Sequence, residues 1–565
     1  MKALLAGIFG AYADKREIQA VLAQPQLYDD YRQMEDIWID YVADLGDGWD
    51  STYAIAWLLA QRTLSLDLPD RDIKLPRGRI LVMGGDQVYP AATREAYRDR
   101  MVGPYRSALP CLSQGESPHL FTIPGNHDWY DGLTSFSRLF CQGRWIGGWR
   151  TRQSRSYFAI KLPHNWWLWG VDIQLESDID KPQLDYFEWV AQHHMRHGDR
   201  VILCTAIPSW LSAGSDVDPD SSSQETGPHH NLTYLVERYI HEYGGHVHLT
   251  LAGDLHHYCH YQDASGHRHK ITSGGGGAFL HGTHGLPETL DLKEGGAQIP
   301  YGQTATFPSV TDSRRMVIQN FLFPVRNLPF VLFLGGFYLL IAWIIRSASK
   351  KHDQTFMEAI QNAPFNPDGI GAVLKQLYLV AAYSPATVVF FLILFVGCIA
   401  FCDPKPERRR WVRKTTRVAV GLTHGLLHAS VSIGLMWGFA HLNLSRLGLG
   451  VDDFRHIVLF SAGMLILGGS FGALIMGVYL FLTNLALGFH QDTAFSSIQI
   501  QDYKNFLRLH IDKTGLTVYP VGIRKVPRTW TFMAQAVAGE PWFEPPGGRI
   551  EAHLIEEPLR IKPPS

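Results

Sequence analysis

Residues 120–128 of the chain read Leu120-Phe121-Thr122-Ile123-Pro124-Gly125-Asn126-His127-Asp128. The first four residues are apolar or β-branched and predict a strand, and the Pro-Gly pair predicts a sharp turn at its end. The turn carries an amide, an imidazole and a carboxyl group on three successive residues. Because open α/β folds bind ligands at the carboxyl ends of their strands, we expect these side chains at a ligand site.

Three further segments show the same arrangement of an apolar run, a glycine turn and acidic or histidine side chains. They end in Asp44-Leu45-Gly46-Asp47-Gly48, in Gly84-Gly85-Asp86 and in Gly253-Asp254-Leu255-His256-His257. Apolar runs alternate with helical patterns between residues 37 and 273, which is typical of α/β layering. The expected strands cover residues 37–42, 79–83, 120–123, 157–162, 166–172, 201–206 and 247–252. A helix is expected over 52–61, with Ser51 or Asp50 as its N-terminal cap.

A strand ending in Gly-Asp, then one ending in Gly-Asn-His-Asp, then one ending in Gly-x-x-His resembles the calcineurin-like metallophosphoesterase superfamily. The continuation to Trp129-Tyr130-Asp131-Gly132 and the run Gly253-Asp254-Leu255-His256-His257-Tyr258 are similar to a membrane-associated branch of that superfamily. The resemblance covers about residues 37 to 290. It implies an α/β fold, a β-sandwich flanked by helices, and a metal-dependent phosphoesterase activity.

The resemblance also implies a role for each matching residue. Asp86 is implied to bridge two divalent metal ions, with Asp44 and His256 at the first ion and Asn126 at the second. His127 is implied to act as a catalytic group near the leaving oxygen, and Asp128 to hold its ring in orientation. One or two metal ions per site are expected, with Mn²⁺, Fe²⁺ or Zn²⁺ favoured and Mg²⁺ as the alternative.

Three positions depart from the pattern of the superfamily. Gly46 and Ala206 stand where histidines are expected, and Asp254 replaces the first histidine of the last motif. Asp47 is an alternative metal ligand beside Gly46, and Asp254 is a carboxylate ligand that favours harder ions. Ala206 offers no ligand, so a one-metal or degenerate centre stays open.

Histidines are concentrated around the last motif. His257, His281 and His284 are candidate substrate contacts, as phosphate-binding groups or spare ligands. The run Gly245-His246-Val247-His248 also reads Gly-His-x-His, but it precedes its strand. We therefore interpret His246 and His248 as strand residues.

The second half of the chain contains four long runs without Lys, Arg, Asp or Glu, at residues 327–345, 377–402, 418–445 and 456–491. About 20 apolar residues cross a bilayer. We therefore predict a transmembrane domain over 316–490, with helices at 327–345, 379–402, 418–441 and 457–487. Glycines near the middle of the last run leave open whether it forms one helix or two. His424 and His428, spaced i, i+4 in the third run, are either functional or hydrogen-bond neighbouring helices.

The loop over 403–417 holds seven Lys or Arg residues, which predicts that it is cytoplasmic. With four spans, the metallophosphoesterase domain (37–315) and the C-terminus are then cytoplasmic as well. Residues 1–36 are expected to form an N-terminal helical segment, with a weak signal peptide ending near Ala11-Tyr12-Ala13 as the competing interpretation. Residues 491–565 are expected to form a small β-rich C-terminal domain, with a hairpin over 506–523.

The formal net charge of -2 gives no general attraction for nucleic acid, so a nucleic-acid partner is not expected. The six cysteines form no C-x-x-C pattern and no disulfide framework. The leading hypothesis is a multi-pass membrane-anchored phosphoesterase that hydrolyses a phosphate ester by metal-bound hydroxide. A lipid-linked phosphodiester or pyrophosphate is one expected substrate, and cyclic nucleotides and phosphoproteins are the alternatives. The alternatives are a catalytically degenerate sensor or binding protein and a transporter that uses His424 and His428.

Overall fold

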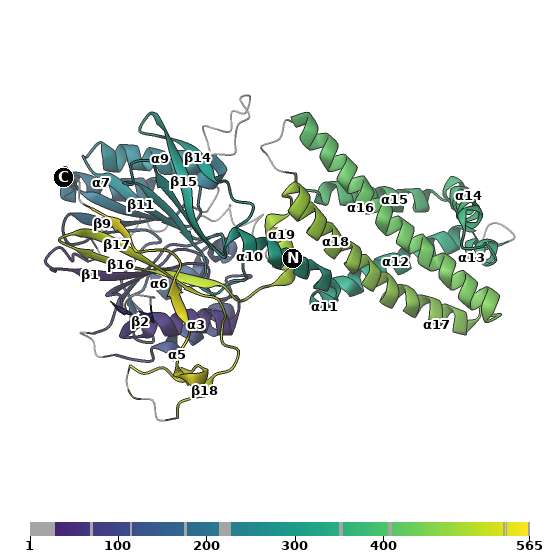
Figure 1. The fold of residues 1–565 in the computed structure, drawn as a ribbon, viewed down its shortest axis with the longest axis horizontal. Helices are drawn as coiled ribbons and strands as arrows, with labels where there is room; N and C mark the ends of the chain where they lie inside the picture. The colour runs from purple at the N-terminus through teal and green to yellow at the C-terminus, as the bar shows by residue number, and fades with distance from the viewer. Residues whose placement is uncertain are drawn as a thin grey trace. The chain divides into compact units, whose positions relative to one another are not determined.

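The structure is a computed structural model that describes residues 27, 29–67, 72–112, 116–173, 178–213, 228–349, 354–404, 410–534, 537 and 539–562 (Figure 1). The chain forms two compact units, one from residues 1–313 with 499–565 and one from residues 314–498. The first unit is mixed α/β and the second is helical. Residues 1–26 of the expected N-terminal helix, with its signal-peptide alternative, lie outside the described residues, as do residues 405–409 of the basic loop.

The first sheet of the α/β unit contains nine strands within the described residues. Their order is β20 (Ala552–Leu554), β17 (Gly515–Ile523), β16 (Lys504–Asp512), β1 (Ile37–Val42), β4 (Ile80–Met83), β5 (His119–Thr122), β7 (Trp149–Thr151) and β6 (Trp145–Ile146), with β21 (Leu559–Ile561) paired to β17. Strands β1, β4 and β5 run parallel, with Ile39 opposite Ile80. Their carboxyl ends therefore meet at one edge.

The second sheet has eight strands in the part of the chain that the structure describes. Their order is β14 (Thr289–Glu294), β15 (Ala297–Phe307), β12 (Tyr258–Asp263), β13 (His269–Ser273), β11 (His246–Ala252), β10 (Arg200–Thr205), β9 (Trp166–Val171) and β8 (Phe158–Lys161). The two sheets pack face to face, because Val82 and Phe121 of the first share one buried cluster with Ile202 and Leu251 of the second. All seven strands expected from the sequence are present, each end within one residue of the expectation.

Helices cover the outer face of each sheet (Figure 1). Helices α3 (Trp49–Ala60) and α5 (Gly103–Ala108) pack on the first sheet, and α7 (Lys181–His194) and α9 (Pro228–Val236) pack on the second. The cap expected for α3 was wrong, because the helix begins after Gly48. Asp50 instead accepts a hydrogen bond from the Trp530 indole at 2.9 Å. The shorter elements are β2 (Thr63–Asp67), β3 (Asp72–Pro76), α4 (Arg94–Ala96), η2 (Tyr97–Val102), η3 (Asp128–Asp131), α6 (Thr134–Phe140), α8 (Trp210–Ala213), η6 (Glu237–His241), β18 (Thr531–Phe532), β19 (Phe543–Glu544) and η10 (Pro546–Gly548).

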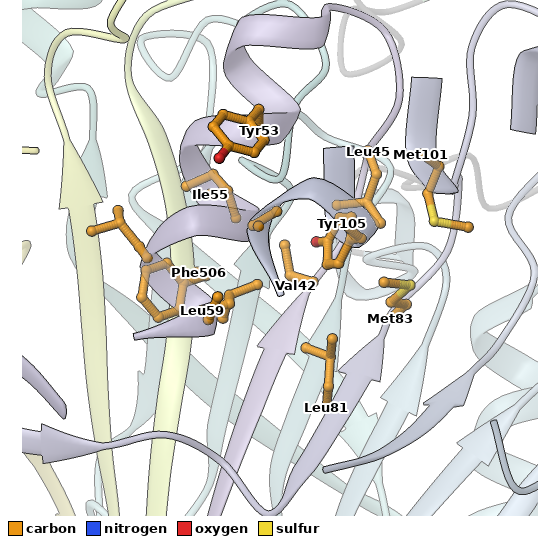
Figure 2. Packing of buried hydrophobic residues seen from close by; sticks show 14 of the residues in the cluster. Val42, Leu45, Tyr53, Ile55, Leu59, Leu81, Met83, Met101, Tyr105 and Phe506 are labelled. Carbon is orange, nitrogen blue, oxygen red and sulfur yellow. The ribbon is translucent and has the colours of Figure 1, made fainter. Parts of the chain in front are cut away.

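The expected hairpin is present as β16 and β17, but it does not form a separate C-terminal domain. Strand β16 pairs antiparallel with β1, with Leu509 opposite Ile39. Figure 2 shows Phe506 of β16 beside Leu59 of α3, in the core of the first sheet. Arg508 is fully buried and its guanidinium lies 2.6 Å from a carboxylate oxygen of Asp40 on β1. The prediction was wrong because the open edge of β1 is filled by a strand that follows the helical unit in the sequence.

The helical unit contains three helices that are long and apolar enough to cross a membrane, counted over the described residues. They are Leu328–Ala348, Trp411–Arg446 and Phe454–Leu487. The last combines α17 (Phe454–Gly463), the π-helical turn η9 (Met464–Gly468) and α18 (Gly469–Leu487), so the fourth apolar run forms one helix. The other elements are α10 (Val310–Met316), η7 (Val317–Leu322), α11 (Phe323–Arg326), α12 (Leu328–Ser349), α13 (Phe356–Ile360), α14 (Pro367–Tyr383), α15 (Pro385–Phe401), α16 (Arg410–Phe439), η8 (Ala440–Arg446) and α19 (Gln491–Ile498).

The helix expected over 379–402 is broken. Helices α14 and α15 meet at an angle of 108°. Pro385 cannot donate a backbone hydrogen bond to the end of α14, and the Ser384 hydroxyl accepts one from the Thr387 amide and so starts α15. The pair counts as a fourth span only if both helices together make one crossing.

Candidate metal and phosphate site

Acidic residues follow strands from both sheets in tight turns. Asp44 follows β1, Asp86 follows β4 and Asp254 follows β11, and all three have a positive φ between 51° and 67°. The turns approach each other so closely that a Cβ on Gly125 would lie 2.1 Å from Oδ1 of Asp86. The glycine of the Gly-Asn-His-Asp turn is therefore required by packing against Asp86.

Three lone pairs converge on the hydroxyl of Tyr89. This oxygen lies 2.8 Å from Asp44 Oδ1, 2.9 Å from Asp86 Oδ2 and 2.9 Å from His256 Nε2. The other ring nitrogen of His256 lies 2.7 Å from the carbonyl oxygen of Phe279. A carbonyl only accepts, so the neutral ring carries its proton on Nδ1 and offers a lone pair at Nε2. Three acceptors thus surround one hydroxyl that has one proton.

The same groups are buried without enough positive charge. Burial raises the pKa of Asp44 well above its usual value, and the neighbouring Asp254 carboxylate adds to the shift. Burial, with Asp128 and Asp44 nearby, does the same to the pKa of Asp86. Oδ2 of Asp44 is buried and has no hydrogen-bond partner among the described residues. Buried carboxylates at this density need a proton or a cation.

The residues fit a divalent cation. Two carboxylates, a phenol oxygen and an imidazole form a donor set suited to first-row transition metals. In the described residues no group of three or more His, Cys, Asp or Glu side chains already has the geometry of a metal site. Tyr89 stands where Asp44, Asp86 and His256 meet.

The other expected ligands lie around this point. The side-chain oxygen of Asn126 is buried and no described group hydrogen-bonds it. The backbone amide of Asp254 donates to Asp44 Oδ1 at 3.1 Å. Asp47 Oδ2 accepts from the Phe279 amide at 3.2 Å and from the Gln501 side-chain amide at 3.4 Å. Ala206 lies beside the Asp86 turn, since a Cβ added to Gly85 would be 3.1 Å from the Ala206 Cβ. Its methyl side chain cannot bind a metal ion.

The role expected for Asp128 was wrong. Its carboxylate accepts from the Tyr97 hydroxyl and, at 2.8 Å, from the Gly125 amide, so it holds the turn rather than the imidazole. The ring of His127 is held by Pro90, whose carbonyl oxygen lies 3.0 Å from Nδ1. The two side chains diverge because the 3-10 helix η3 starts at Asp128 and directs its carboxylate into the protein. Burial raises the pKa of Asp128 to about 7 and lowers the pKa of His127.

The three histidines expected to contact substrate occupy other positions. His257 is only 1% exposed, and burial lowers its pKa to about 3. His281 stacks on His256 with ring centroids 3.9 Å apart, so it supports that residue from behind. Nδ1 of His284 lies 2.8 Å from the Ser313 hydroxyl. His281 is thus held by its stacking on His256, and His284 by Ser313.

Two residues of the site escaped the sequence reasoning. Tyr89 was missed, although it stands three residues after Asp86 in the same turn and its spacing is a usable signal. Lys504 on β16 is fully buried, its Nζ has no hydrogen-bond partner among the described residues, and its pKa is lowered to about 7 by burial. The carboxylates of Asp47 and Asp44 are among the charges that act on its ammonium group. Nothing in the sequence indicates that this lysine approaches a turn more than 400 residues earlier.

Comparisons with known proteins add little. No family model and no curated protein matches the chain. One similar solved structure is that of GAP50, the anchor in the inner membrane complex of Plasmodium, at 14% identity and a TM-score of 0.30, covering 44% of this chain and 74% of that one. Another is PhoD, at 10% identity and a TM-score of 0.28, covering 44% of this chain and 58% of that one. Similarities this low carry no argument about function.

Proposed function

We propose that the α/β unit is a metal-dependent phosphoesterase whose cation is held by Asp44, Asp86, Tyr89 and His256. The observation that carries the proposal is the convergence of Asp44 Oδ1, Asp86 Oδ2 and His256 Nε2 on the single proton of Tyr89. The order of the Gly-Asp, Gly-Asn-His-Asp and Gly-x-x-His turns, with its resemblance to metallophosphoesterases, supports it. When bound, the cation supplies charge neutralisation for the phosphate oxygens and activates the attacking water.

His127 is the proton-transfer group in this proposal. Pro90 accepts from Nδ1, which leaves Nε2 as the atom that takes up or delivers a proton. The backbone amide of His127 donates to Asp86 Oδ1 at 2.8 Å, so the ring keeps a fixed position relative to the carboxylates. Its lowered pKa keeps the ring neutral near pH 7. In this proposal, Asn126 and Asp254 bind either a second, more weakly held cation or the substrate.

The apolar helices favour a substrate that is already at a membrane. A lipid-linked phosphodiester or pyrophosphate meets this condition, and in this proposal the site faces the cytoplasm, in agreement with the basic loop. A reporter fused after Ser565 tests the sidedness. If the α/β unit is cytoplasmic and the chain then crosses the membrane an even number of times, the reporter is cytoplasmic as well. An external reading contradicts this orientation.

The function is tested with the detergent-purified full chain and Mn²⁺. Hydrolysis of a phosphomonoester and a phosphodiester is measured beside metal binding, for the native protein, Asp86→Asn and Asp99→Asn. Asp99 is exposed and pairs with Arg98, so its variant is the matched control. We expect Asp86→Asn to lose metal binding and at least about a thousandfold in rate, as for other essential groups. Full activity in Asp86→Asn rules out the proposed site.

The second candidate is a binding protein or sensor, and Ala206 favours it. An alanine at a ligand position leaves the second cation only Asp86, Asn126 and Asp254. Metal binding that depends on Asp86, together with no hydrolysis of either ester, supports this candidate against the phosphoesterase.

A further inference from the structure

The chain enters the helical unit through a short helical segment, residues 314–326, which we call the entry segment. It consists of the end of α10, the 3-10 turn η7 and α11. At Asn327 the backbone leaves the helical region, with φ −119° and ψ 51°, and α12 begins at Leu328. Since α12 has 22 residues and rises about 1.5 Å per residue, it is long enough to cross the roughly 30 Å of hydrocarbon in a bilayer by itself. The entry segment is therefore not needed for the crossing.

One face of the entry segment packs into the helical unit. Val317, Asn320 and Phe323 are buried. Oδ1 of Asn320 lies 2.8 Å from the Ser497 hydroxyl on α19. The approach to α18 is equally close, because a Cβ on Gly477 would collide with the Asn320 carbonyl oxygen. The segment is thus fixed against α18 and α19, so its other face has a defined direction.

The opposite face of the entry segment is exposed and apolar. Between 44% and 81% of the side-chain surface is exposed at Ile318, Phe321, Leu322 and Val325. Their spacing of i, i+3, i+4 and i+7 places them on one side of a helix. Leu328, the first residue of α12, is exposed as well, so this apolar stripe continues in the sequence into a helix apolar enough to cross a membrane. Exposed apolar stripes of this kind mark contacts with a partner or a membrane.

Two arginines come just before the apolar stripe. Arg314 and Arg315 are exposed, and neither guanidinium group has a hydrogen-bond or ion-pair partner among the described residues. Arg326 at the other end of the entry segment differs, because its guanidinium donates to the Ile498 carbonyl and, at 2.8 Å, to Oε1 of Gln319. Arg314 and Arg315 can therefore bind an anion without giving up a contact within the protein.

We propose that the entry segment lies in the surface of a membrane, where Arg314 and Arg315 bind the phosphate groups of anionic phospholipids and the apolar stripe contacts their acyl chains. Basic side chains beside an apolar face are typical of helices that lie in the membrane interface. Arginine suits phosphate because its guanidinium donates from a planar fork. The continuity of the stripe with α12 favours lipid over a soluble protein partner, since the exposed side chains of α12 need lipid around them as well.

Both connections of the helical unit to the α/β unit start at this place. The Asn327 side-chain amide donates to the Ser497 carbonyl at 2.9 Å, which holds α19 beside the start of α12. The chain therefore enters the helical unit before residue 314 and leaves it after residue 498 at the same membrane surface. Lipid binding by the entry segment does not depend on the proposed phosphoesterase activity.

The proposal is tested on the full chain in nanodiscs made of equal amounts of phosphatidylglycerol and phosphatidylcholine. A trace of one lipid or the other carries a diazirine at the same carbon of its acyl chain, and the label on each peptide is measured by mass spectrometry. We expect phosphatidylglycerol to label the entry segment roughly thirtyfold more than phosphatidylcholine, because each arginine near an anionic surface contributes about fivefold. Residues 377–402 carry no charged side chain, so they should show no such preference.

Three double variants make the result specific. Arg314→Gln with Arg315→Gln should remove most of the preference for phosphatidylglycerol, and Arg314→Lys with Arg315→Lys is the matched control, because it keeps the charge and should keep most of the preference. Ile318→Ser with Val325→Ser should lower labelling of the entry segment by both lipids. All four side chains are exposed, so labelling of residues 377–402 should not change. Equal labelling by both lipids in the native protein, an undiminished preference in the glutamine variant or undiminished labelling in the serine variant overturns the proposal.

Discussion

The two units each bury a cluster that contains a tyrosine and a histidine, and the clusters differ in their acidic groups. The Tyr89 hydroxyl meets the carboxylates of Asp44 and Asp86 as well as His256, whereas the chain of Tyr338, His428 and His424 contains no carboxylate. Buried carboxylates need a proton or a cation, but a chain without them can be satisfied by hydrogen bonds alone. The comparison therefore assigns the cation to the first cluster.

The largest effect is expected from His127→Gln, which removes the proton-transfer group that only the first cluster possesses. The rate of ester hydrolysis should fall by roughly a hundredfold to ten-thousandfold with little change in KM, as is typical of a general acid or base. Mn²⁺ binding measured by equilibrium dialysis should stay unchanged, because His127 contacts Asp86 only through its backbone amide. Loss of Mn²⁺ binding in this variant contradicts the assigned role.

Arg508→Met is expected to have the second-largest effect, on stability, because it removes the positive charge of the buried ion pair between Arg508 and Asp40. Asp40 is left buried without its guanidinium, which costs about 3–5 kcal/mol. Thermal unfolding in detergent, followed by tryptophan fluorescence, should show the loss. The double variant Asp40→Leu with Arg508→Met should regain most of it, and a double variant no more stable than the single one shows that the pair is not the cause.

Tyr89→Phe removes the oxygen at the centre of the first cluster and keeps the ring. Affinity for Mn²⁺ should fall by at least roughly tenfold to a hundredfold, the cost of losing a group that only supports a ligand, because Tyr89 is itself one of the four proposed ligands. Tyr130→Phe is the control, because the Tyr130 ring lies beside His127 with centroids 4.8 Å apart. Unchanged or tighter Mn²⁺ binding in Tyr89→Phe means that Tyr89 blocks the site instead of completing it.

The smallest effect is expected from His257, which is buried next to His256, and it concerns how stability depends on pH. The pKa of His257 is about 3 in the folded protein, below the roughly 6.5 of an unfolded chain. Between these values the unfolded state binds more protons, so the free energy of unfolding decreases as the pH falls from 6.5, by about 1.4 kcal/mol per pH unit for this group. Stability measured in EDTA from pH 7 to pH 5 should fall less steeply in His257→Leu. Equal slopes in both proteins contradict the assignment.

The sequence predicts the strands of the α/β unit well because each has a short apolar run and a glycine turn. It predicts their partners less well. Nothing in residues 504–512 indicates that they lie beside β1, since pairing depends on an open sheet edge and not on a local pattern. The absence of charges predicts one helix over 379–402, but Pro385 favours the start of a new helix, and this local signal outweighs the apolar run.

The site was predictable where the chemistry follows from spacing. Asp44 and Asp86 lie together because β1 and β4 are parallel neighbours in the first sheet, and His256 meets them from the second sheet, where it follows β11. Tyr89 and Lys504 were missed, and Asp128 was given the wrong partner. The contacts of Tyr89, Lys504 and Asp128 depend on the direction in which each side chain points. A sequence motif gives the order of the residues but not those directions.

The position of β16 beside β1 also affects how the protein is made. About 190 residues separate Ser313 from Lys504, so at roughly 5–20 residues per second the ribosome needs about 10–40 seconds to add them. During that time β1 has an unpaired edge, and unpaired edges invite aggregation. The edge of β1 is thus covered only when the last part of the chain has been made.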